Sequence, residues 1–256
     1  MLSKNKIRFI QSLARKKIRE QEKVFLVEGN KMVLEAIEAG RQLKTLCATS
    51  GFLAENNISP QMATEVIEVS PEEMQKASLL QTPQQALAVV NMPEQHFNLT
   101  DSTQDLALAL DFIQDPGNLG TIIRLADWFG IRHILCSENT VDCFNPKVIQ
   151  SSMGAIFRVE VHYLNLVETL KMAAASGTKI FGTFLEGENL YKHPLSKNGI
   201  LVMGNEGNGI SEEVARMVTD KVHIPAFPGG QTGSESLNVA TATAICCAEF
   251  RRRMMD

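Results

Sequence analysis

The sequence lacks any long uninterrupted apolar run. No apolar stretch approaches the roughly 20 residues that cross a bilayer as a helix. The first residues, MLSKNKIRFIQSLARKK, scatter charge through the positions where a secretory signal peptide would have an unbroken apolar core. With 44% apolar and 21% charged residues over 256 positions, the composition is that of a globular protein. We therefore expect a cytoplasmic protein of two domains that makes no contact with a membrane.

Cysteine patterns for disulfides or zinc are also missing. The five cysteines form no C-x-x-C pair and have no histidine nearby at ligand spacing. They are Cys47, Cys136, Cys143, Cys246 and Cys247. We expect reduced core residues and no metal cofactor.

The motifs of several enzyme classes are absent as well. A dinucleotide site needs G-x-G-x-x-G after the first strand, whereas DPGNLG has the wrong spacing, and GGQTGSES lacks the lysine of a Walker A loop. There is no G-x-S-x-G elbow, and none of the five histidines lies in a triad context. Hydride transfer, nucleotide hydrolysis and serine-hydrolase chemistry are therefore disfavoured.

Charge is distributed unevenly along the chain. The net charge is −4, yet residues 1–23 contain eight basic side chains against Glu20 and Glu22. Apolar residues in the first 17 positions recur at helical spacing, which predicts one basic amphipathic helix over residues 3–17. It could bind a polyanion such as RNA or simply be a solvated helix face. The candidate RNA contacts are Lys4, Lys6, Arg8, Arg15, Lys16 and Lys17.

The first hundred residues read as a small α/β layer domain. Strands are expected at 24–27, 43–48, 66–69 and 86–90, with helices at 29–39 and after Ser70-Pro71. Residues 51–60 read as a loop. The polar, aperiodic stretch 91–104 is the best linker, so we expect a first domain at 1–98 and a second at 99–256.

The second part alternates strands and helices. Strands are expected at 106–112, 133–136, 158–161, 179–184, 199–203 and 222–224, and helices at 120–129, 146–153, 167–175, 212–218 and 236–255. Strands such as ILVM are apolar on both faces, which is typical of a parallel sheet covered by helices. Ligands of such sheets bind at the carboxyl ends of the strands.

Three Gly/Asn-rich segments follow strands in this part: DPGNLG, GNEGNG and GGQTGSESLN. Their polar residues are Asn118, Arg124, Asn205, Glu206, Ser236 and Asn238. Each also has an ordinary interpretation, because Arg124 could extend from an apolar helix into water, Glu206 could be a turn residue, and Ser or Asn often caps a helix. The residues alone leave these alternatives open.

The three segments resemble the three signature motifs of the SpoU/TrmH family of SPOUT-class RNA methyltransferases. The similarity includes DPGNLGTIIRLADWFG, VMGNEGNGIS, and IP followed by SLNV and an apolar helix, all in order. It extends to FNPKVIQSSMGAIFRV, and the first half resembles the family's small RNA substrate-binding domain. The resemblance covers nearly the whole chain and implies an α/β fold with a parallel-sheet SPOUT domain that ends in a trefoil knot.

The resemblance also implies residue roles. Arg124 would be the main catalytic residue, with Asn118, Glu206, Ser236 and Asn238 completing the polar set. S-adenosylmethionine would lie against Thr183, Gly204, Ile224 and Leu237, mostly through main-chain groups. Whether Arg124 accepts the proton or stabilises phosphate and alkoxide stays open, and Glu206 would orient it.

The implied function is transfer of a methyl group from S-adenosylmethionine to a ribose 2′-hydroxyl of structured RNA, ribosomal RNA being favoured over transfer RNA. Alternatives are a non-catalytic RNA-binding or ribosome-assembly module of the same fold, or an RNA base methyltransferase. The resemblance also implies a homodimer formed through the C-terminal domain.

Overall fold

The computed structural model describes residues 2–94, 97–227 and 236–255, without the side chains of residues 101 and 102. Its contacts divide the chain into two compact units. Unit 1 contains residues 1–94 together with residues 142–157, and unit 2 contains residues 95–141 and 158–256. The division into domains at 1–98 and 99–256 stays a prediction. The contacts additionally group residues 142–157 with the first unit.

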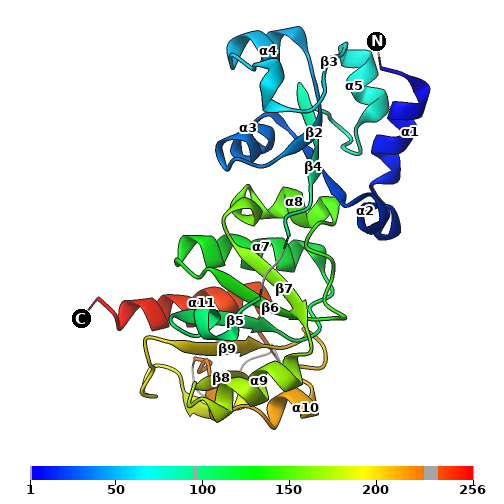
Figure 1. Ribbon diagram of the computed structural model, residues 1–256. Coiled ribbons are helices and arrows are strands. Elements are labelled where there is room, and N and C mark those ends of the chain that lie inside the picture. Colours follow the sequence, from blue (N-terminus) through cyan, green and yellow to red (C-terminus); the bar gives the residue numbers. More distant parts are fainter. Residues whose placement is uncertain (1, 95–96, 228–235, 256) are drawn as a thin grey trace. The chain divides into compact units, whose positions relative to one another are not determined.

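Unit 1 is built on a four-stranded sheet in the order β1-β4-β2-β3. The strands are β1 (Val24–Glu28), β2 (Leu43–Ala48), β3 (Val66–Glu68) and β4 (Ala86–Asn91). β4 runs antiparallel to β1 and β2, whereas β2 and β3 are parallel. The helices around it are α1 (Lys4–Ser12), α2 (Lys16–Glu22), α3 (Asn30–Glu38), α4 (Ser50–Glu55) and α5 (Pro71–Ala77), with a 3-10 turn at Pro60–Met62. Helices α1 and α5 lie beside each other (Figure 1). Helix α5 begins as predicted, with Ser70 and Glu73 forming a reciprocal capping box.

The basic N-terminal segment forms two helices rather than the single helix predicted over 3–17. Arg19 of α2 is 1% exposed. Its Nη1 donates to the carbonyl oxygens of Leu13 (2.7 Å) and Ala14 (2.9 Å), which lie at the end of α1. A guanidinium therefore satisfies carbonyl groups that a continued helix would have bonded internally, and the chain turns there. Arg19 is thus a core residue although it carries one of the eight basic charges.

The segment 142–157 packs within unit 1. Arg19 also donates to the carboxylate of Asp142 at the start of this segment. The ring of Phe144 lies 4.6 Å from that of Phe25 on β1, and Gln150 on α8 (Pro146–Ser152) donates to the carbonyl oxygen of Glu28 at 2.8 Å. A 3-10 turn at Ala155–Phe157 ends the segment.

Unit 2 contains a six-stranded parallel sheet in the order β10-β8-β9-β5-β6-β7. Its strands are β5 (Leu106–Leu110), β6 (His133–Ser137), β7 (Glu160–Leu164), β8 (Ile180–Asn189), β9 (Gly199–Met203) and β10 (Asp220–His223). Every residue of the central strands β5 and β9 is buried. The predicted α/β fold, with a parallel sheet whose strands are apolar on both faces, is confirmed.

Helices cover both faces of this sheet. Helices α9 (Leu166–Ala175) and α10 (Glu212–Ala215) neighbour each other and pack on one apolar face, which includes Ala107, Leu135 and Val202 (Figure 1). Helices α7 (Pro116–Trp128) and α11 (Val239–Arg252) pack against each other. A short helix, α6 (Leu99–Ser102), lies in the stretch predicted to be a linker. Of the described helices, none is long and apolar enough to span a membrane.

The cysteines are core residues, as predicted. All five are buried and unbonded to one another. Burial raises the pKa of the Cys47 and Cys246 thiols to about 12, so both stay protonated at neutral pH. Cys246 and Cys247 are 0% exposed within one chain, so they offer no surface to a second chain.

We predict that Arg19→Met lowers the free energy of unfolding by about 3–5 kcal/mol, because it leaves Asp142 and two carbonyl groups without their donor. Urea unfolding followed by circular dichroism measures this loss. Arg15→Ala is the matched control, since Arg15 is exposed and should cost less than about 0.5 kcal/mol. Equal stability of the two variants would contradict the structural role of Arg19.

Candidate active site

The three polar segments leave the sheet at the carboxyl ends of β5, β9 and β10. Strands β5 and β9 are neighbours, and their last residues, Leu110 and Met203, lie in register. The backbone N–H of Asp111 continues the pairing by donating to the carbonyl oxygen of Met203 at 2.9 Å. Segments 111–118 and 204–210 therefore start side by side although about ninety residues separate them.

The first segment is helical rather than a loop. Helix α7 begins at Pro116, not at residue 120 as predicted, so most of DPGNLG forms its first turns. Asp115 caps the helix by accepting from the backbone N–H of Asn118 at 2.8 Å, and proline occupies the first turn, where no N–H is needed. This cap fixes the position of the Asn118 side chain.

Asn118 joins all three segments through its side-chain amide. Its Nδ2 donates to Oε1 of Glu206 at 2.6 Å, and its Oδ1 accepts from Nδ2 of Asn238 at 3.0 Å. Oδ1 of Asn238 in turn caps α11 by accepting from the backbone N–H groups of Ala240 and Thr241. We call Glu206, Asn118 and Asn238 the amide relay.

The direction of every bond in the amide relay is fixed by its ends. An ionised carboxylate can only accept, so the NH₂ group of Asn118 must face Glu206. At the other end, backbone N–H groups require the oxygen of Asn238, which leaves its NH₂ group to face Asn118. The orientations of both amides follow from their partners.

Asn205 shapes the second segment. Its Oδ1 accepts from the backbone N–H groups of Gly207 (2.9 Å) and Asn208 (3.1 Å), and its Nδ2 donates to the carbonyl oxygen of Phe112 (2.9 Å). Backbone bonds between Asn205 and Gly209 close the loop. The sequence analysis gave Asn205 no role of its own, but here it holds the loop that carries Glu206.

Gly204 is required by close packing of this loop. A Cβ built on it would lie 2.2 Å from the carbonyl carbon of Gly209 and 2.3 Å from the backbone nitrogen of Ile210. These are backbone atoms, so no side-chain rotation could relieve the overlap. Any substitution of Gly204 would open the loop.

Two residues after β5 also position the site, and sequence reasoning did not select them. Asp111 is buried, and its Oδ2 accepts from the backbone N–H of Ser211 at 2.8 Å, which joins the first segment to the end of the second. Phe112 has φ +63°, which is uncommon for a bulky residue and costs about 1–3 kcal/mol. The available signal was an acid near the end of an otherwise apolar predicted strand, at residues 106–112.

Arg124 lies on α7, and its side chain is exposed. Among the residues that the structure describes, its guanidinium makes no hydrogen bond or ion pair. Glu206 bonds to Asn118, which differs from the expectation that it orients Arg124. Thr121 and Trp128 are exposed one turn before and after Arg124, so the three share a helix face, and Trp128 is 83% exposed.

The remaining predicted residues lie at the same edge of the sheet. Ser236 and Leu237 are exposed directly before the Asn238 cap, and Leu237 is 49% exposed. Ile224 is half-buried after β10, and Oγ1 of Thr183 on β8 donates to the carbonyl oxygen of Val202 at 3.2 Å. Residues 228–235, which include the glycines expected to turn the chain into a knot, lie outside the described residues, so the knot stays a prediction.

The predicted RNA contacts of unit 1 do not form a uniform surface. Lys4, Arg8, Arg15, Lys16 and Lys17 are exposed. Lys6 instead pairs with Glu65, and its ammonium group lowers the pKa of that carboxyl.

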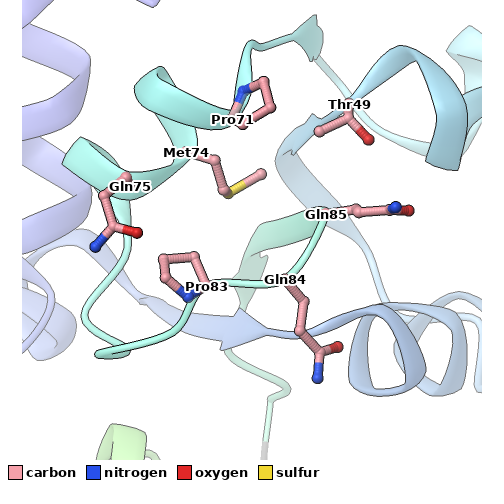
Figure 2. Close-up of a pocket in the computed structure, with 7 residues that line it drawn as sticks. All are labelled: Thr49, Pro71, Met74, Gln75, Pro83, Gln84 and Gln85. Atoms are coloured by element: carbon pink, nitrogen blue, oxygen red, sulfur yellow. The ribbon is translucent and has the colours of Figure 1, made fainter.

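A hollow in unit 1 lies between the end of β2, helix α5 and the segment before β4 (Figure 2). It is lined by Thr49, Pro71, Met74, Gln75, Pro83, Gln84 and Gln85, none of which is charged. Oε1 of Gln84 accepts from the backbone N–H of Asn30 at 2.7 Å, which fixes one wall.

Comparison with known families identifies the chain. Residues 105–248 match the SpoU rRNA Methylase family, and residues 4–88 match the MRM3-like substrate binding domain. The chain belongs to the SpoU rRNA methylase family. The resemblance seen in the sequence is confirmed.

Individual relatives cover the whole chain. It is 32% identical over 249 residues to the 23S rRNA (guanosine(2553)-2′-O)-methyltransferase RlmP of Bacillus subtilis, with 96% of each protein covered. A solved structure from Porphyromonas gingivalis, assigned to the TrmH family of RNA methyltransferases, is 43% identical with a TM-score of 0.90 and covers 99% of each chain. The AdoMet-bound rRNA methyltransferase of Sinorhizobium meliloti is 29% identical with a TM-score of 0.87, and covers 100% of this chain and 97% of its own.

We predict that Asn118→Asp destabilises unit 2, because it places a second carboxylate against Glu206 while retaining the bond from Asn238. Adding Glu206→Gln restores a donor, so the double variant should recover stability, with a coupling energy of about 0.5–3 kcal/mol in a double-mutant cycle of thermal unfolding. Asn208→Asp is the control, since its side chain is exposed. Strict additivity of the two substitutions would show that the amide relay contributes nothing.

Proposed function

We propose that this protein transfers a methyl group from S-adenosylmethionine to a ribose 2′-hydroxyl of ribosomal RNA. The observation that supports it most directly is the amide relay, which brings together residues of all three polar segments at the carboxyl edge of the sheet. Family membership and relatives that act on rRNA point to the same reaction.

Because the methyl donor is already activated, the main task of the protein is to position the oxygen nucleophile. S-adenosylmethionine would supply an activated methyl group: O2′ bonds to the methyl carbon, the carbon–sulfur bond breaks with its electron pair staying on the sulfur, and the hydroxyl proton passes to solvent. The protein must align O2′ behind that carbon and stabilise the oxygen as its proton leaves. Exact positioning of this kind is what the capped helices and the amide relay provide.

Arg124 is the candidate for stabilising the oxygen. Its exposed guanidinium carries a fork of donors that suits a phosphate or a developing alkoxide. Because no described residue already pairs with it, the group is available to substrate. We assign Arg124 to phosphate and alkoxide binding rather than to proton abstraction, since a guanidinium is too basic to accept the proton readily.

The residues assigned to the methyl donor suit it chemically. Leu237 offers exposed apolar surface beside Asn238, which fits an adenine ring, and the second segment, which turns tightly at Gly204, offers main-chain groups at the same edge of the sheet. Thr183 lies within β8, and Ile224 directly follows β10, the strand paired with β8. Their direct contacts with the donor are part of the proposal.

Unit 1 would bind the RNA. The exposed basic residues of α1 and α2 suit phosphates, while the uncharged hollow, with three glutamine amides beside apolar walls, suits a nucleobase better than a phosphate (Figure 2). Its match to a substrate binding domain supports this role.

Ribose-methylation mapping of total RNA from cells with and without the gene tests the proposal. Loss of one 2′-O-methyl signal in ribosomal RNA is expected, and the purified protein should restore it on unmodified RNA. A signal lost from transfer RNA would identify transfer RNA as the substrate. Loss of a base methylation would identify the protein as an RNA base methyltransferase. If no signal is lost and the protein does not bind the donor, a non-catalytic RNA-binding module is favoured.

We predict that Arg124→Ala lowers methyl transfer by at least roughly 100-fold, the usual cost of removing a group that stabilises developing charge. Donor affinity, measured by calorimetry, should stay within about twofold of the parent. Arg216→Ala is the control, because Arg216 is exposed on the same unit and pairs with Glu212. Full turnover by Arg124→Ala would remove it from the mechanism.

We also propose a homodimer formed through unit 2, in which the exposed ring of Trp128 at the end of α7 is covered while Arg124, one turn earlier, stays open to substrate. Trp128 is the only tryptophan in the chain and is 83% exposed. Its fluorescence should therefore shift to shorter wavelength as the protein is concentrated, in step with the mass from light scattering. A monomer at micromolar concentration with constant emission would contradict the dimer.

A further inference from the structure

Three metal-ligand side chains meet at the opposite edge of the unit 2 sheet. His133 and Glu160 are the first residues of β6 and β7, and they pair in register. His162 is two residues beyond Glu160, so it lies on the same face of the sheet. This is the amino edge of the strands, whereas the amide relay lies at their carboxyl edge.

The facing atoms form a nearly equilateral triangle. Nδ1 of His133 lies 3.4 Å from Nε2 of His162, and Oε2 of Glu160 lies 3.6 Å from each of them. A triangle with sides of 3.4, 3.6 and 3.6 Å has a circumradius of about 2.0 Å, which matches the bond lengths of zinc to histidine nitrogen and carboxylate oxygen.

Hydrogen bonding explains these separations poorly. Nitrogen and oxygen atoms that share a proton usually lie about 2.7–3.2 Å apart, and all three distances are longer. A proton could also bridge only one pair at a time. An ion at the centre would satisfy the three atoms together.

Neighbouring side chains orient the carboxylate toward the two imidazoles. Nε and Nη2 of Arg132 both donate to Oε1 of Glu160, at 2.9 and 2.8 Å, which leaves Oε2 directed at the histidines. The ring of Phe97 covers His162 at 5.2 Å between centroids. The His162 side chain is 4% exposed and that of Glu160 is 40% exposed, so one side of the cluster is closed and the other open to water.

We propose that His133, Glu160 and His162 bind one divalent transition-metal ion of the zinc type, with a fourth position open to water. A set of two imidazoles and one carboxylate binds ions of the zinc type more readily than it binds magnesium or calcium. Throughout residues 2–94, 97–227 and 236–255, this is the one group of three or more histidine, cysteine or acidic side chains with such spacing. The site does not depend on the methyl-transfer activity, since it uses the other edge of the sheet.

Calorimetric titration of the metal-stripped full-length protein with zinc sulfate tests the site. One ion per chain is expected, together with a rise in melting temperature because the ion binds only the folded sheet. Glu160→Gln and His133→Ala should each weaken binding at least roughly 100-fold, and Arg132→Ala roughly 10-fold as a residue that only orients a ligand. Glu160 is exposed enough for the first variant to keep its fold.

The matched control is His223→Ala, since His223 bonds to the carbonyl oxygen of Gly187 outside the cluster. It should bind zinc as the parent does. Methyl transfer by Glu160→Gln should equal that of the parent, so failure of the metal site and failure of the proposed activity are distinguishable. Absence of stoichiometric binding by the parent, or unchanged affinity in both Glu160→Gln and His133→Ala, would overturn the proposal.

Discussion

The hydrogen bond from Asn118 to Glu206 is the interaction on which the rest of the site depends. A carboxylate that can only accept sets the orientation of the Asn118 amide, and that amide then holds Asn238. The backbone N–H of Asn118 donates to the Asp115 cap of α7, and Asn238 caps α11 through its Oδ1. Two residues of the amide relay therefore also take part in the capping bonds at the starts of these helices.

The parallel sheet makes this convergence possible. Strands β5 and β9 are adjacent and end in register, so Asp111 and Met203 meet, and Asp111 reaches across to Ser211. The loop between Gly204 and Ile210 is then too tight for a Cβ at its first residue. Rigid strand ends, rather than the polar side chains themselves, account for how closely the two segments approach.

Periodicity and capping residues predicted which segments form strands and that the sheet of the second part is parallel, and the motifs predicted which segments meet. They did not predict that DPGNLG is helical, because glycines usually indicate a turn, whereas the Asp115 cap and Pro116 outweigh them here. The break after Ser12 depends on Arg19, which donates to the carbonyl oxygen of Leu13 and also pairs with Asp142, a residue far along the chain that the local sequence pattern cannot reveal. Likewise His133 and Glu160 become neighbours only through the register of β6 and β7, which composition cannot give.

The basic N-terminal segment illustrates how formal charge overstates available charge. Arg19 pairs with Asp142 and donates to two carbonyl groups, and Lys6 pairs with Glu65. The positive charges of both side chains are therefore balanced by groups of unit 1. The remaining exposed cations can attract phosphates, but such attraction is independent of sequence and weakens with salt. The hollow lined by Gln75, Gln84 and Gln85 places uncharged amides beside apolar walls. In the proposed complex with RNA, these groups suit an unstacked base, whereas the exposed cations suit phosphates.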